Sequence, residues 1–260
     1  MMRILKYSFF DLVRSWWIYL YFGFFLLLTS SLFLLGYAVP QVVITLSNIL
    51  LIFCPLIAAM MGIMYYYNSR EFVDLLLAQP LKRRDIFLGQ YLGLASSLSG
   101  SLVAGIGIPF IIFGVFGSAD IWNFSILLLV GVILSFVFSS IAYLVALVSS
   151  NRLVGFALVI GIWLFFAVIY DGIFLILLST FKDYPLDTFA IGASILNPID
   201  LSRILILLKL DISALMGFTG AVFNKFFGSL TGMSISTAIL ICWTVLPIFL
   251  IVKKASNKDF

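Results

Sequence analysis

Side chains that commonly carry out catalysis are scarce in this sequence. Its 260 residues include no histidine and a single glutamate, Glu71. Histidine is a common base or metal ligand of hydrolases, and no Gly-Lys pair is present to form the phosphate-binding loop of an ATPase. We therefore expect that the chain has no catalytic residue, is not an enzyme and binds no cofactor of its own.

Sulfur-bearing side chains in one apolar run have the chemistry to bind a soft metal ion. Met60 and Met64 share a helix face, and Cys54 lies above them in the same run. Thioethers and thiolates suit Cu(I), but methionine also fills gaps in apolar packing. Met60 and Met64 are therefore candidate ligands of a copper path, with ordinary packing as the alternative.

Asp171, in the sequence "IYDGIF", is the one acidic residue inside an expected membrane span. Ionisable groups in lipid are costly and often functional. A residue close to the end of its span can also reach water by tilting, so a structural role stays open. A proton relay needs more groups of this kind, which argues against a proton-coupled secondary transporter.

The sequence "LNPIDLSRI" is the second polar motif, and it follows the fifth apolar run. Asn197 before Pro198 is typical of a helix start, because the asparagine accepts at the cap and proline fits the first helical position. Asp200 and Arg203 then mark a polar side of this helix. The segment is a candidate outer gate or periplasmic docking surface, with a helix that lies on the outer membrane surface or caps the spans as the alternative.

The overall composition is that of an integral membrane protein. Hydrophobic residues make up 63% of the chain and charged residues 10%, against about 45–50% and 25% in soluble domains. A bilayer core needs about 20 apolar residues per helix, and six stretches qualify. The net charge of +4 is better explained by membrane topology than by binding of nucleic acid.

These stretches predict an all-α fold within one transmembrane domain, 1–260. An amphipathic helix is expected at 1–15 and a second, short one at 69–80, with a periplasmic segment at 179–234. The expected transmembrane helices are 16–36, 42–67, 91–116, 124–148, 153–178 and 235–252.

Lysine and arginine residues fall unevenly on the two sides of this arrangement. Eleven lie on the side that holds both termini and four on the other side. Positive residues mark the cytoplasmic face, so we expect a multi-pass protein of the cell inner membrane with both termini in the cytoplasm. An even number of spans agrees with this topology.

The most charged part of the chain is "NSREFVDLLLAQPLKRRDIFLGQY", between the second and third spans. In its first half, Phe72 and Leu76 form an apolar pair four residues apart, and Glu71 and Asp74 share a polar edge. Pro80 ends this helix. The basic half anchors the loop at the membrane surface, and the amphipathic half is suited to dock on a soluble partner.

This loop resembles the "E-x-x-LLL-x-x-P-x-x-R" loop of type-2 permeases of ATP-binding cassette (ABC) transporters. The resemblance implies that 71–79 is a coupling helix seated in a separate ATPase subunit, which would hold ATP and Mg²⁺. It also implies an elbow helix at the N-terminus, six spans and pairing with a second copy of the chain. The implied coupling residues are Glu71, Phe72, Asp74, Leu75, Leu76, Gln79, Pro80 and Arg83.

Within this family, "LLLAQP" and "LNPIDLSRI" most resemble NosY-type permeases of the exporter that matures the copper site of nitrous oxide reductase in denitrification. That resemblance implies a periplasmic copper-handling partner. Lys82 departs from the pattern, because the family often has a small hydroxyl residue there, so the start of the third span is less certain. Permeases of gliding-motility or other small ABC exporters, and a non-transporting membrane assembly factor, remain alternatives. The cargo is not readable from the sequence.

Overall fold

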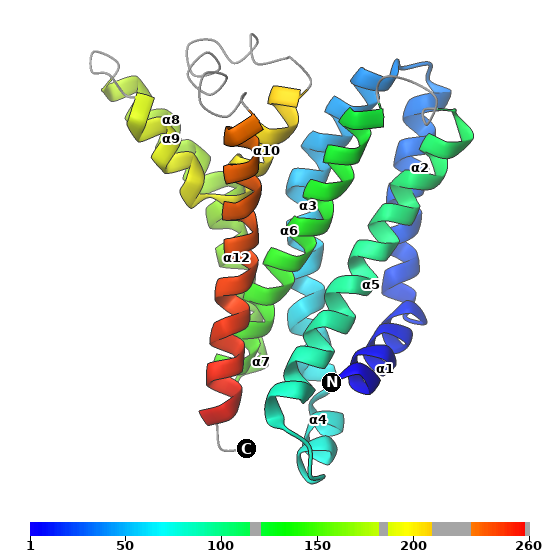
Figure 1. Cartoon of the computed structure of the whole chain (residues 1–260), viewed down its shortest axis with the longest axis vertical. Helices are drawn as coiled ribbons and strands as arrows, with labels where there is room; N and C mark the ends of the chain where they lie inside the picture. Colours follow the sequence, from blue (N-terminus) through cyan, green and yellow to red (C-terminus); the bar gives the residue numbers. More distant parts are fainter. Residues whose placement is uncertain (115–120, 182–186, 210–229, 258–260) are drawn as a thin grey trace.

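The computed structural model describes residues 1–114, 121–181, 187–209 and 230–257. Within these ranges all regular elements are helices, and they form an upright bundle (Figure 1). The N-terminus and the last turns of the C-terminal helix lie at the same end of the bundle. The helices that cross the bundle are α2 (Trp16–Leu34), α3 (Val39–Asn68), α5 (Arg83–Ile112), α6 (Ile121–Val148), α7 (Arg152–Leu164) continued by η2 (Phe165–Ile169) and α8 (Tyr170–Thr180), and α12 (Leu230–Asn257).

Six of the described helices are long and apolar enough to cross a membrane, counting α7 to α8 as one. The shortest, α2, has 19 residues, and α3 and α5 have 30 each. At 1.5 Å per residue these lengths match a bilayer core of about 30 Å. The expected all-α integral membrane fold with six spans is confirmed.

The first and last turns of some helices extend beyond the spans expected from hydropathy. α5 begins at Arg83, earlier than the expected span 91–116, and so includes the polar turns that hydropathy leaves out. Ile86 and Phe87 in these turns are fully buried, so packing against neighbouring helices holds them in helical form. The first residues of α5 therefore belong to the bundle as well as to the charged loop.

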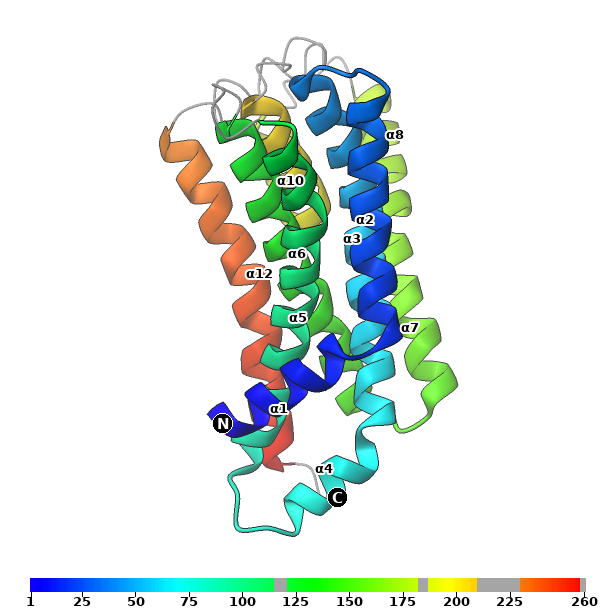
Figure 2. The same ribbon diagram turned by 90° about the vertical axis from the view of Figure 1, so that its right-hand side faces the viewer.

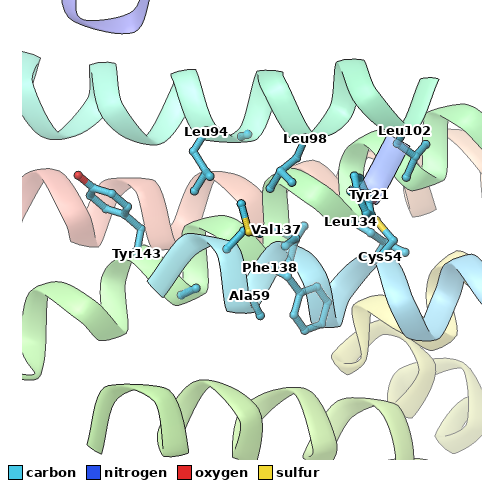
Figure 3. Packing of buried hydrophobic residues seen from close by; sticks show 14 of the residues in the cluster. Tyr21, Cys54, Ala59, Leu94, Leu98, Leu102, Leu134, Val137, Phe138 and Tyr143 are labelled. Atoms are coloured by element: carbon cyan, nitrogen blue, oxygen red, sulfur yellow. The ribbon is translucent and has the colours of Figure 1, made fainter. Parts of the chain in front are cut away.

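The core lies mainly between α3, α5 and α6, with α2 and α12 packed around them. Cys54 is fully buried there and lies 3.2 Å from the Oγ atom of Ser135 and 3.4 Å from the carbonyl oxygen of Gly131. Figure 3 shows part of this core, with Tyr21, Leu134 and Leu102 nearest to Cys54. The labelled residues are Tyr21, Cys54, Ala59, Leu94, Leu98, Leu102, Leu134, Val137, Phe138 and Tyr143.

The N-terminal helix α1 (Met2–Val13) runs across the bundle at the end that carries the N-terminus (Figure 2). It buries Ile4, Ser8 and Leu12 on one face and packs on α5. A Cβ atom added at Gly93 of α5 would lie 2.6 Å from the Cβ atom of Ser8. The absence of a side chain at Gly93 is therefore what allows the two helix backbones to meet.

Two further helices form a sharply bent pair: α9 (Asp187–Leu196) and α10 (Pro198–Lys209). They meet at an angle of 114°, and both extend toward the end of the bundle opposite α1 (Figure 1). α10 contacts α3, α6 and α12 and buries Leu201, so this part of the expected periplasmic segment packs among the spans and does not lie on the membrane surface. Residues 210–229 of that segment lie outside the described part of the chain.

Candidate functional site

The expected coupling helix corresponds to α4 (Arg70–Leu77), a short helix at the end of the bundle that carries the N-terminus (Figures 1 and 2). Ser69 joins it directly to α3. After α4 the chain bends, and α5 begins at Arg83. The helix is therefore held between two long spans at its two ends.

The expected coupling residues divide into a covered and an open set. Leu76 is half-buried against the core, beside Val73, a buried residue that is not in the expected set. The ring of Phe72 stacks on Tyr7 of α1, with centroids 4.8 Å apart and planes inclined by 25°. The exposed members of the set are Glu71, Asp74, Leu75, Gln79, Pro80 and Arg83. Of the leucines in this helix, Leu75 is thus the one free to contact another protein, with 68% of its surface exposed.

A buried polar contact lies directly behind α4. The hydroxyl of Tyr143 in α6 donates to the Oε1 atom of Gln90 in α5 at 2.6 Å. The amide nitrogen of Gln90 donates to the hydroxyl of Ser69 at 3.5 Å, and Ser69 is the residue at which α3 ends and α4 begins. Gln90 and Tyr143 are both fully buried. This chain of contacts joins α3, α5 and α6 at the base of the coupling helix.

Sequence reasoning did not identify Gln90 or Tyr143. The sequence offers one signal, the amide side chain of Gln90 directly before an apolar run. A buried amide requires a hydrogen-bond partner. The identity of that partner depends on how α5 packs against α6.

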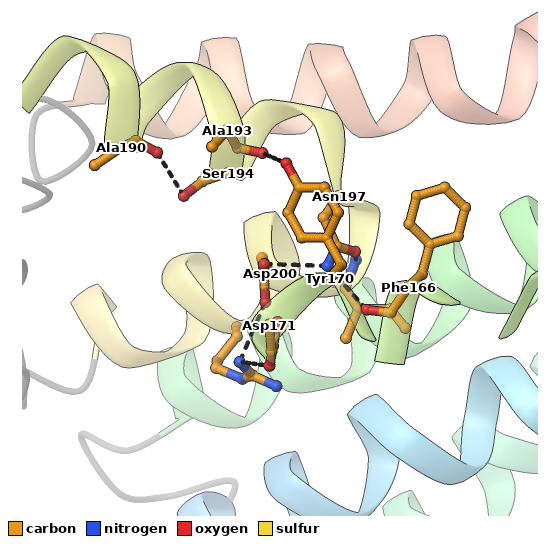
Figure 4. Close-up of polar contacts among 10 residues, drawn as sticks. Phe166, Tyr170, Asp171, Ala190, Ala193, Ser194, Asn197 and Asp200 are labelled. Carbon is orange, nitrogen blue, oxygen red and sulfur yellow. Dashed lines mark hydrogen bonds and ion pairs between the residues drawn. The ribbon is translucent and has the colours of Figure 1, made fainter. Parts of the chain in front are cut away.

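The second polar site lies at the corner between α9 and α10 (Figure 4). Arg203 donates through one guanidinium nitrogen to Asp171 at 2.8 Å and to Asp200 at 3.1 Å. The side chains of Asp171, Asp200 and Arg203 are 27%, 10% and 33% exposed. One cation therefore holds two carboxylates together, and the fifth span is linked to α10 through charge.

Asn197 occupies the bend, and its side chain makes three hydrogen bonds. Its side-chain oxygen accepts from the backbone N–H of Ile199 at 3.0 Å, which caps α10. Its amide nitrogen donates to Asp200 at 3.1 Å and to the carbonyl oxygen of Phe166 at 2.9 Å. Phe166 belongs to η2, a π-helical turn in the fifth span, so the side chain that starts α10 also bonds to the irregular turn of the neighbouring span.

Two more bonds fix the last turn of α9, whose carbonyl groups lack partners within the helix. Tyr170 of α8 donates its hydroxyl to the carbonyl oxygen of Ala193 at 2.6 Å. Trp243 of α12 donates its indole N–H to the carbonyl oxygen of Ile195 at 3.2 Å. The bent pair is thereby attached to both the fifth and the sixth spans, and sequence reasoning anticipated neither Tyr170 nor Trp243.

The structure therefore brings together Asn197, Asp200 and Arg203, which were expected to act jointly, with Asp171, which was weighed separately. Pro198 follows Asn197 as the first residue of α10. The candidate copper ligands Met60 and Met64 lie four residues apart in α3. Met60 is on the outside of the bundle with 36% exposure, whereas Cys54 is fully buried beside α6. Met64 lines a cavity beside α1.

The chain is similar to a protein described as "Probable ABC transporter permease protein NosY" from Stutzerimonas stutzeri. The two are 25% identical over 175 residues, which is 65% of this chain and 63% of that protein. The chain thus matches a little under two thirds of the length of that relative. No protein-family profile matches the sequence. The similarity supports the ABC permease family in general, that is, a multi-pass membrane subunit, and it does not extend to a particular transporter.

Proposed function

We propose that this chain is the membrane-spanning permease subunit of an ABC transporter and that it works with a separate cytoplasmic ATPase subunit. The observation that carries this proposal is α4, a short helix with Glu71, Asp74 and Leu75 exposed beyond the ends of the long spans. An amphipathic helix with acidic groups and one open leucine is suited to a groove on a soluble partner. The similarity to an ABC permease supports the same assignment.

In this function α4 receives the movement that accompanies ATP hydrolysis. Val73 and Leu76 fix the helix to the bundle on its inner face, and Ser69 connects it to α3 without an intervening loop. A push on α4 therefore acts on α3 directly. It acts on α5 and α6 through Gln90 and Tyr143.

On the side of the bundle opposite α4, the α9–α10 pair, whose bend at Asn197 is buried within the bundle, is the candidate outer gate or docking surface for a partner. The bonds of Asn197 to Phe166 and of Arg203 to Asp171 tie the α9–α10 pair to the fifth span. Movement of that span would move the pair with it. Since the ion pair joins only partly exposed groups, it holds two packed elements together and does not form an open charged surface.

The excess of lysine and arginine on the side of α4 supports a cytoplasmic position of both termini in the inner membrane. Pairing with a second copy of the chain and a periplasmic partner that handles copper complete the proposal. The finer role, in maturation of the copper site of nitrous oxide reductase, rests on the resemblance of "LLLAQP" and "LNPIDLSRI" to NosY-type permeases and on the similarity reported above.

Co-purification with the ATPase subunit tests the proposal. Leu75→Asp places a charge at the exposed position of α4 and leaves the buried face intact, so we expect the membrane fraction to lose the ATPase subunit. Leu153→Asp is the matched control, since Leu153 is also exposed, at 80%, near the start of α7. Equal retention of the ATPase by both variants and the unchanged chain would contradict the coupling role of α4.

A further inference from the structure

A cavity of about 640 Å³ lies between α1, the end of α3 and α4. Its walls include Trp17, at the start of α2, and Tyr65, in the last turns of α3. Tryptophan and tyrosine concentrate where the hydrocarbon core meets the headgroups of a membrane. The cavity is therefore at the depth of lipid headgroups, at the end of the bundle that carries the N-terminus.

The lining of the cavity combines apolar and charged side chains. Trp17 and the half-buried Met64 contribute apolar surface, and Asp11 and Arg14 contribute charge. A phospholipid has this same division between its acyl chains and its headgroup. The open and mixed character of the cavity favours a lipid over a small polar solute.

Asp11 and Arg14 are the charged residues among those that line the cavity. Three positions separate them, so their side chains are neighbours along α1. Both are exposed, and neither forms an ion pair within the described residues. The cavity therefore offers a negatively charged hydrogen-bond acceptor, Asp11, beside a positively charged hydrogen-bond donor, Arg14.

We propose that this cavity binds the headgroup of an aminophospholipid of the phosphatidylethanolamine type. The guanidinium of Arg14 donates to the phosphate, and the carboxylate of Asp11 accepts from the ammonium group at the end of the short ethanolamine arm. The acyl chains then leave past Met64 and Trp17 toward the bilayer. Charge complementarity favours this lipid over phosphatidylglycerol, whose headgroup has no ammonium group for Asp11, and over phosphatidylcholine, whose headgroup has no N–H to donate.

Binding at this position would connect α1 to α4, the helix that receives the movement in the proposed function. The cavity is bordered by Tyr7 of α1 and Phe72 of α4, whose rings stack with centroids 4.8 Å apart. A bound lipid would fill the space beside this contact and resist separation of α1 from α4. Lipid binding itself can be measured on the isolated chain, so its outcome is independent of whether the chain couples to an ATPase.

Native mass spectrometry of the full chain in detergent tests the proposal, with phosphatidylethanolamine, phosphatidylcholine and phosphatidylglycerol added in separate samples. We expect phosphatidylethanolamine to be retained about fivefold or more over phosphatidylcholine, as for one charge-assisted contact. Asp11→Asn should remove this preference. Arg14→Gln should lower the binding of both phosphatidylethanolamine and phosphatidylglycerol.

Arg152→Gln is the matched control, because Arg152 is an exposed arginine at the start of α7 and does not line the cavity. It should bind lipid as the unchanged chain does. Since Asp11 and Arg14 are exposed, their variants should retain the helical content and elution volume of the unchanged chain. Equal retention of the three lipids, or wild-type retention by both cavity variants, would overturn the proposal. Displacement of the lipid by an equal concentration of soluble phosphoethanolamine would identify a free phosphate ester as the ligand and would also overturn it.

Discussion

The hydroxyl of Tyr143 donates to Gln90 at 2.6 Å inside the bundle, and both side chains are fully buried. Gln90 in turn lies 3.5 Å from the hydroxyl of Ser69, where α3 passes into α4. Polar groups buried in this position have few other hydrogen-bond partners, since lipid and apolar side chains offer none. The helix proposed to meet the ATPase is therefore connected to two further spans by specific bonds and by packing.

Removing one partner of this contact should cost more than removing both. Gln90→Leu leaves the Tyr143 hydroxyl buried without a partner, and we expect a loss of about 1–3 kcal/mol of unfolding free energy. In Gln90→Leu with Tyr143→Phe, both polar groups are gone and most of this loss should be recovered. Thermal unfolding in detergent of the two single variants and the double variant measures the coupling. Additive losses would contradict the pairing.

Asn197 should be more sensitive to substitution than an ordinary helix cap. Asn197→Ala removes the cap of α10 and the bond to the carbonyl oxygen of Phe166, so we expect a loss of about 1–2 kcal/mol. Asn197→Asp keeps an acceptor for the cap but cannot donate to Phe166, and it adds a carboxylate beside Asp200. Limited proteolysis and thermal unfolding should rank both variants below the unchanged chain. A stability of Asn197→Asp equal to that of the unchanged chain would show that the cap alone matters.

Arg203 should be the critical member of its cluster. Arg203→Met leaves Asp171 and Asp200 near each other without a cation, and we expect a loss on the order of 1–3 kcal/mol. Adding Asp171→Asn and Asp200→Asn removes the uncompensated charge and should restore part of the stability. Thermal unfolding of the single and triple variants tests this. If the triple variant is the least stable, the carboxylates do not depend on Arg203 in the way described.

Gly93 should be required for the attachment of α1 to α5. A Cβ atom there would lie 2.6 Å from that of Ser8, so Gly93→Ala should displace α1 and lower the melting temperature. Gly93→Ala with Ser8→Gly removes the closest contact and should recover part of this loss, although the backbone oxygen of Leu5 stays 3.0 Å from the added Cβ atom. Gly100→Ala on the same helix is the control, because a Cβ atom at Gly100 meets nothing within 4 Å. Equal effects at Gly93 and Gly100 would mean that helix propensity, and not the close approach, sets the result.

The spans and the short amphipathic helices could be predicted from sequence because each depends on local composition. The apolar runs are long enough to cross a bilayer, and α4 carries its own apolar and acidic faces. Gln90 and Tyr143 could not be paired in this way, because their contact depends on how α5 meets α6.

Helix α10 shows in the same way that local sequence predicts a helix start but not its long-range contacts. The start of α10 at Asn197–Pro198 follows from cap chemistry. The return of α10 into the bundle, and the contact of Arg203 with Asp171, depend on packing between segments far apart in sequence. For the same reason Asp171 and the "LNPIDLSRI" motif were interpreted separately, although their side chains meet.

Photo-crosslinking from position 75 tests the central claim, that the exposed face of α4 contacts the ATPase subunit, most directly. A photoreactive phenylalanine analogue replaces Leu75 in one sample and Leu153 in the other, and membranes containing the assembled complex are irradiated. We predict an adduct with the mass of the chain plus the ATPase subunit from position 75 and none from position 153. A complex that stays assembled but gives no adduct from position 75, or gives equal adducts from both positions, would contradict the claim.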